Sequence, residues 1–222
     1  MKMLLLSLVA FAPTGMINPP PGVVARVYVR VEVDPQGVIQ DVRFRESTGE
    51  RLQAILRERV KSWRFDPATV HGKPAAAQTT VTIELKPGAD GQSLDLAGVS
   101  AGVAPLRVVP PRYQPPVGNT VQRGSVVLRC KVMADGRCRD ITVERASAPE
   151  LLQKNAMTAL GRWRFETEVV AGVAVEPWIL IPFCFSPDRH SGTPPECASG
   201  EAHAVAGTQP SQLTLRDPLA GH

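Results

Sequence analysis

One pattern of residues occurs twice in this chain, and that repeat restricts the possible folds more than any other feature. Trp63-Arg64-Phe65 returns one hundred residues later as Trp163-Arg164-Phe165, and Gly72 returns as Gly172. Further matches are Ser47–Glu50 with Ser147–Glu150 at the same offset, and Asp34–Gly37 with Met133–Gly136 at an offset of ninety-nine, where one inserted residue explains the change. Landmarks in one order at one spacing predict two tandem copies of a small domain.

Each copy is predicted to form a strand, a turn, a strand, a helix and a strand. In the first copy Val27, Val29, Val31 and Val33 alternate with polar residues, which is the period of a strand with one buried face. A glycine turn, a second short strand, a helical segment and a third strand follow. The second copy repeats this order with Val126, Leu128, Cys130 and Val132 in its first strand.

Apolar residues at helical spacing predict one helix in each copy. The first stripe contains Leu52, Ile55, Leu56, Val60 and Trp63, and the second contains Leu152, Ala156, Leu160 and Trp163. Ser47 with Glu50, and Ser147 with Glu150, have the spacing of a capping box. The Trp and Phe rings of the W-R-F triplets could form a binding platform, but such small domains favour a place in the core.

This order of elements predicts an α+β fold: two tandem ββαβ domains, each a three-stranded antiparallel sheet with one helix on one face. A right-handed crossover gives the strand order 2-1-3, so strands two and three are edges and the second face of each sheet is wet. We expect the domains at residues 23–85 and 106–185, a linker at 86–105 and a flexible tail at 186–222. Within the tail, 212–216 could form a short strand that folds back onto an edge.

The first 22 residues resemble an export signal followed by a Pro-rich lead. A basic start precedes the apolar run Leu4–Ala12, which is too short to span a bilayer of about 30 Å. The alternative is a buried N-terminal strand. We therefore expect an exported protein that acts in the periplasm.

Charge argues against a nucleic-acid partner. Lys and Arg total 25 against 21 Asp and Glu, which leaves a net charge of only +4, spread evenly along the chain.

These residues together resemble the C-terminal domain of the TonB energy transducers. The shared signature is the alternating strand, the turn ending in glycine, the second strand, the helix ending in W-R-F and the last strand. The resemblance implies a three-stranded antiparallel sheet with one helix. It also implies a periplasmic protein that contacts outer-membrane transporters, with a transporter segment added to the third strand. Energy transducers of that family carry a membrane helix and a long spacer, so this sequence favours partner binding over energy transduction.

An edge strand presents unpaired backbone groups that a peptide can satisfy as an added strand. In the first copy this edge has no proline, and we expect the peptide to bind there, at Thr79, Thr80, Val81, Thr82, Ile83, Glu84 and Leu85. The matching strand of the second copy contains Pro182, which has no N–H and marks an edge position.

Four cysteines in an exported protein indicate disulfides, and four allow three pairings. Cys130 and Cys138 can both point inward across one hairpin, whereas Cys184, between Phe183 and Phe185, should face outward. We predict the pairs Cys130–Cys138 and Cys184–Cys197.

Two motifs suggest chemistry that we do not expect. Cys184, His190, Cys197 and His203 are spaced too widely for a structural zinc knuckle. Gly98-Val99-Ser100-Ala101-Gly102 matches a nucleophile elbow but lies in the expected linker, without the required strand before it and helix after it. The sequence therefore predicts no enzyme, no metal, no cofactor and no small-molecule substrate.

Two functions remain. The first is a periplasmic module that binds outer-membrane transporters or other envelope proteins by strand addition, and a homodimer is compatible with it. The second is an exported structural scaffold whose sheet edges protect each other and have no peptide ligand.

Overall fold

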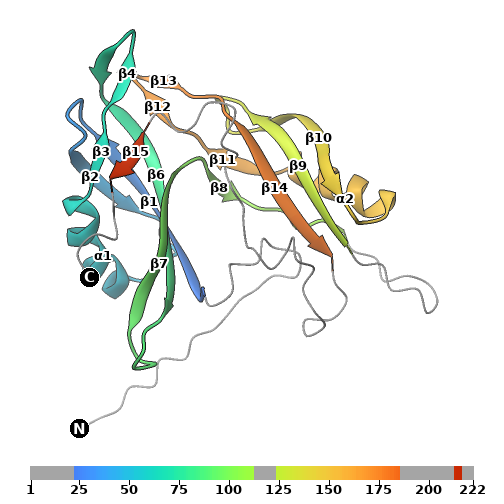
Figure 1. Ribbon diagram of the computed structural model, residues 1–222, viewed down its shortest axis with the longest axis horizontal. Helices are drawn as coiled ribbons and strands as arrows, with labels where there is room; N and C mark the ends of the chain where they lie inside the picture. Colours follow the sequence, from blue (N-terminus) through green and yellow to red (C-terminus); the bar gives the residue numbers. More distant parts are fainter. Residues whose placement is uncertain (1–22, 113–123, 186–212, 217–222) are drawn as a thin grey trace.

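The computed structural model describes residues 23–112, 124–185 and 213–216. The predicted export signal and most of the predicted tail lie outside these residues. The chain forms two lobes, each with a sheet and one helix, which confirms the α+β class (Figure 1). The first lobe contains β1 (Ala25–Val33), β2 (Ile39–Phe44), α1 (Glu50–Ser62), β3 (Arg64–Asp66), β4 (Ala68–Val70), β5 (Lys73–Ala75) and β6 (Ala77–Pro87).

The expected linker is not a plain connector, because it contributes β7 (Leu94–Gly102) and β8 (Ala104–Arg107). The second lobe contains β9 (Gly124–Val132), β10 (Cys138–Ala146), α2 (Glu150–Leu160), β11 (Arg164–Glu166), β12 (Val169–Val170), β13 (Val173–Ala174) and β14 (Trp178–Phe185), and β15 (Thr214–Arg216) follows. Two separate ββαβ units are therefore too simple a description.

The main strands of each lobe are antiparallel, and the first strand of each copy is central. The larger sheet has the order β13-β12-β6-β1-β2, with β7 also paired to β6, and the second sheet has the order β10-β9-β14. Two strands of the second copy, β12 and β13, therefore extend the sheet of the first copy. The strand β8, which begins in the expected linker and ends in the expected second domain, pairs with β11 of the second copy.

Alternating valines build the core of the first lobe, because every second side chain of β1 points to one face. Val29 and Val31 are fully buried, and α1 covers them with Leu56 and Val60. Ile55, expected on the same stripe, is 64% exposed because it lies about 100° around the helix from Leu56. In the second lobe all four residues of the expected stripe are buried: Leu152, Ala156, Leu160 and Trp163.

The predicted capping boxes do not form. Both helices begin two residues later than a box requires, with Gly49 and Pro149 at the N-cap and no side-chain cap. Glu50 and Glu150 are therefore first-turn residues, where a carboxylate favours the positive end of the helix dipole. A different repeated contact fixes each start: Gln53 donates to the Thr48 carbonyl at 2.6 Å, and Gln153 to the Ala148 carbonyl at 2.8 Å.

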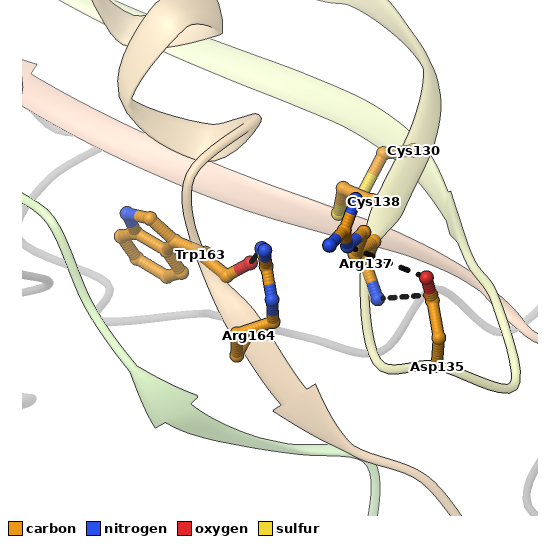
Figure 2. The surroundings of a disulfide bond; sticks show 6 residues. All are labelled: Cys130, Asp135, Arg137, Cys138, Trp163 and Arg164. Atoms are coloured by element: carbon orange, nitrogen blue, oxygen red, sulfur yellow. Dashed lines mark hydrogen bonds and ion pairs between the residues drawn. A yellow bond between two sulfur atoms is a disulfide. The ribbon is translucent and has the colours of Figure 1, made fainter.

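The W-R-F triplet joins the helix to the hairpin turn in both copies. The four aromatic rings of the two triplets are buried, as predicted for core residues: Trp63, Phe65, Trp163 and Phe165. Each Phe N–H donates to the carbonyl of the turn glycine, Phe65 to Gly37 at 2.9 Å and Phe165 to Gly136 at 2.8 Å. The Arg of each triplet turns back to the Trp carbonyl at the helix end, at 2.8 Å for Arg64 and 2.7 Å for Arg164 (Figure 2).

Candidate functional site: the two sheet edges

The outer edge of β6 is the expected partner-binding site, and its backbone alternates between two neighbours. The Leu85 carbonyl accepts from Val24 N–H at 2.8 Å on the β1 side, whereas the Ala76 carbonyl accepts from Ala171 N–H at 2.9 Å on the opposite side. Because successive residues of a strand point their backbone groups to opposite sides, Val81 and Ile83 face β1. Thr82 and Glu84 therefore face the outer edge.

That outer edge is occupied, which corrects the expectation that it is free to pair. The β7 strand pairs antiparallel with β6 from Thr80, opposite Gly102, to Pro87, opposite Leu94. The strand β12 takes the beginning of the same edge, where Val170 lies opposite Ala77. In Figure 1, β6 and β7 form a long hairpin that projects from the first lobe.

The side chains of the predicted peptide-binding strand divide between the core and the outer face. Thr79, Val81, Ile83 and Leu85 belong to the buried residues, so they are not available to a partner. Glu84 is ion-paired with Arg26 of β1 at 2.7 Å. A partner at this edge would therefore meet mainly backbone groups, together with Thr82 and Glu84.

Carboxylates of the second copy lie against the first sheet. The Thr79 hydroxyl donates to Glu168 at 2.6 Å, and the Thr80 hydroxyl to Glu166 at 2.9 Å. Glu168 is only 2% exposed. Arg30 of β1 donates to the Thr167 carbonyl at 2.7 Å. Burial lowers the pKa of the Arg30 guanidinium, and the nearby carboxylates of Glu166 and Glu168 oppose that shift.

Arg45 extends this contact across the expected wet face of the first sheet. Its guanidinium lies 4.2 Å from the Tyr28 ring centre, and it donates to the Pro105 carbonyl at 2.7 Å. Glu166 lies 3.7 Å from the same guanidinium. Burial raises the pKa of Tyr28, while the charges of Arg26 and Arg45 lower it. Part of the face expected to be wet is therefore an inter-repeat contact.

The matching strand of the second copy, β14, has an open side within the residues that the structure describes. It pairs with β9 in a three-stranded sheet, and no described strand pairs with its other side. The Pro177 carbonyl accepts from Val132 N–H at 2.8 Å, so odd-numbered residues of β14 face β9. The backbone groups of Trp178, Leu180 and Pro182 are therefore directed away from β9.

Pro182 therefore lies where the sequence predicted an edge position, and its missing N–H leaves the ladder to β9 intact. On this side the N–H group of Leu180 precedes the proline. The carbonyl groups of Trp178, Leu180 and Pro182 face the same way. An extended peptide can satisfy these groups as a fourth strand.

Comparison with known proteins identifies the family of this chain. The family described as Gram-negative bacterial TonB protein C-terminal matches residues 22–87 and again residues 110–187, which together make up more than half of the chain. The chain belongs to this TonB C-terminal family.

The similar proteins are TonB proteins. The chain is 28% identical over 89 residues to the Protein TonB of two Xanthomonas campestris pv. campestris strains, B100 and ATCC 33913. That alignment covers 40% of this chain and spans about two fifths, 40%, of each relative. The solution NMR structure of the Pseudomonas aeruginosa TonB C-terminal domain is 25% identical, with a TM-score of 0.32, over 39% of this chain and 88% of that one.

The TonB-like second repeat contains the predicted Cys130–Cys138 disulfide, with a Cα–Cα distance of 5.6 Å. Figure 2 shows it beside the turn in which Asp135 contacts Arg137. Cys184 is also disulfide-bonded. Its predicted partner, Cys197, lies outside the described residues, so that pairing stays a prediction.

The residues singled out for other chemistry do not assemble into a site. Ser100 lies within β7, in the middle of a strand, and not at a strand-to-helix turn. Among the described residues no group of three His, Cys, Asp or Glu side chains could hold a metal ion, and His190 and His203 lie outside them. Within the same residues, no helix has the length and apolar character needed to cross a membrane.

The short strand predicted near the C-terminus exists as β15. It pairs with β3, where Leu215 lies opposite Phe65, and Leu213 before it is buried. It therefore covers the W-R-F segment of the first repeat instead of the edge of β6 or β14. Nothing in its pairing supports the idea that it competes with a partner at those edges.

Proposed function

We propose that this chain is a TonB-like protein-binding module of the periplasm that takes part in transport across the outer membrane. Its partners are segments of outer-membrane transporters or of other envelope proteins, and they bind by adding a strand to the third strand of a repeat. Membership of the TonB C-terminal family supports this role. The pairing of β7 with β6 is the observation that supports strand addition, because there a strand of this chain fills such an edge in antiparallel register.

The two edges have different parts in this function. Among the described residues no strand covers the outer side of β14, toward which the Leu180 N–H is directed, so we assign the partner to this side. The first-repeat edge, Thr79 to Leu85, is the site that the sequence predicts. It accepts a partner only where β7 or β12 is displaced.

An NMR titration of the isotope-labelled chain with peptides from the periplasmic N-termini of outer-membrane transporters tests the proposal. We expect shifts in the amides of β14, above all that of Leu180. A matched pair of peptides makes the test specific to strand addition. N-methyl groups on the alternate amides that face β14 should abolish binding, and N-methyl groups on the other amides should leave it intact. Equal loss with both methylated peptides would refute strand addition.

A structural scaffold is the second candidate, because the chain itself covers the β6 edge with β7 and β12. The same titration separates the two functions. Absence of shifts at both edges, with the open-side amides of β14 already protected from hydrogen exchange, would favour the scaffold.

A further inference from the structure

The β6 edge is covered in two parts that are held in different ways. The first part, at Ala77 and Gln78, pairs with β12. Next to it stand the buried contact of Thr79 with Glu168 and the partly buried contact of Thr80 with Glu166, which connect the two repeats. Removing β12 would strip buried polar groups of their partners, which is costly. This part of the edge is fixed.

The second part, from Thr80 to Pro87, is covered by β7, and β7 is held mainly by its backbone. None of its nine residues is buried. Leu96, Val99 and Ala101 are only partly buried against the core of the first lobe. Within the described part of the chain, no side-chain hydrogen bond or ion pair joins β7 to another element. Glycine, alanine and serine make up much of the strand, so its release exposes little apolar surface.

The turn before β7 keeps this strand beside its edge. Asp90 accepts hydrogen bonds from the N–H groups of Gln92 and Ser93, at 2.9 and 2.8 Å, and from the Ser93 hydroxyl at 2.7 Å. Gly88 N–H also donates to the Ser93 carbonyl at 2.9 Å. A released β7 therefore remains tethered within a short distance of β6. Its return is an intramolecular event with a high effective concentration.

We propose that β7 is a built-in, displaceable occupant of the first repeat's partner edge. A partner strand reaches Thr82 and Glu84 only when β7 has left. The inference rests on the proposed function and adds its regulation: no described strand covers the outer side of β14, whereas the chain itself closes the β6 edge. The apparent affinity of the β6 edge is its intrinsic affinity multiplied by the fraction of molecules in which β7 is displaced.

Two proline variants of the full chain provide a matched comparison. Ser100 lies opposite Thr82, whose backbone groups face β7, so the Ser100 N–H is directed at β6. Ala101 lies opposite Val81, whose groups face β1, so its N–H is directed away. Ser100→Pro removes a bond that holds β7, whereas Ala101→Pro introduces the same ring on the other side of the strand.

A third variant fixes β7 in place. Thr82→Cys with Ser100→Cys puts two cysteines directly opposite each other, at a typical Cα separation of about 5.5 Å that a disulfide can bridge. Mass spectrometry verifies the new bond. The probe is a fluorescent peptide with the sequence of residues 94–102, which is β7 itself supplied from outside.

We expect Ser100→Pro to bind the probe at least tenfold more tightly than the native chain and Ala101→Pro, and the disulfide variant to show no binding at the β6 edge. Equal probe affinity in Ser100→Pro and the native chain, or unchanged binding to the disulfide variant, would overturn the proposal. If transporter peptides bind neither edge while the probe binds Ser100→Pro, the proposed function fails and the displaceable strand stands.

Hydrogen exchange of the native chain gives a second test that needs no variant. The amides of Thr82 and Glu84 face β7, and those of Val81 and Ile83 face β1. We expect the first pair to exchange at least tenfold faster, because they are freed by local opening of β7 alone. Equal rates for the two pairs would mean that β7 leaves only with global unfolding, and the proposal would be wrong.

Discussion

Alanine at Gly37 would test the contact between the hairpin turn and the W-R-F segment. Gly37 has a φ of +82°, and a Cβ placed there would collide with the Phe65 carbonyl oxygen. That carbonyl belongs to the same residue whose N–H donates to Gly37. The second repeat has the same arrangement, since a Cβ at Gly136, with a φ of +75°, would meet the Phe165 carbonyl.

Gly72 is the matched control. Its φ is +75°, close to that of Gly37, but a Cβ there would have nothing within 4 Å. Alanine costs about 1–2 kcal/mol at either position, because an L-residue is disfavoured at positive φ. The collision at Gly37 adds about 1–3 kcal/mol, the usual cost of forcing extra atoms into a packed site. The effect of alanine on the unfolded chain is the same in both variants and cancels in the difference.

Urea denaturation followed by tryptophan fluorescence measures both variants, because Trp63 is buried in the first core. We expect Gly37→Ala to lower the free energy of unfolding by about 2–5 kcal/mol, and Gly72→Ala by about 1–2 kcal/mol. Equal losses would show that the backbone angle alone matters. The turn would then not be packed against Phe65 as described.

Three further predictions concern other contacts. The N–H groups of Ser93 and Gln92 hold the pKa of Asp90 at about 2, below its ordinary 3.8. The contribution of this carboxylate to folding stability is therefore complete above pH 3.8 and is lost as the pH falls through about 2. NMR titration of the carboxylate should show this, with a higher pKa in Ser93→Ala, and a native value near 3.8 would contradict it. Thr79→Val should lower the free energy of unfolding by about 1.5–3 kcal/mol, because the hydrogen bond to Glu168 is lost. The control Thr82→Val should change that free energy by no more than about 0.5 kcal/mol. Replacing both Cys130 and Cys138 by alanine should lower the free energy of unfolding by about 2.5 kcal/mol or more, because the disulfide no longer closes its short loop in the unfolded chain. Thermal denaturation measures this, and an unchanged melting temperature would argue against it.

The sequence predicts the central strands, the helices and the buried W-R-F rings because each leaves a periodic signal. The alternation of the valines in β1 fits only a strand with one buried face, and the spacing of Leu152, Ala156 and Leu160 fits only one face of a helix. The Cys130–Cys138 pairing was predictable for the same reason, since both cysteines occupy inward positions of one hairpin.

The covering of the β6 edge could not be predicted from these patterns. Leu94–Gly102 has no alternation and is rich in small residues, so its strand conformation comes from the neighbouring edge and not from its own side chains. Val169 and Val170 form too short a segment to indicate a strand. Arg45, expected on a wet face, is covered because the second repeat brings Glu166 to it from far along the chain.

Pro182 has a consequence for how a partner lies on β14. A strand added there finds a donor at Leu180 but none at Pro182, so one of its own carbonyls is left to water. Sliding the strand by two residues transfers that unmatched carbonyl to a different residue of the partner. A partner that places a bulge or an ordered water opposite Pro182 loses the least binding free energy. The proline therefore favours one alignment among segments whose side chains would allow several.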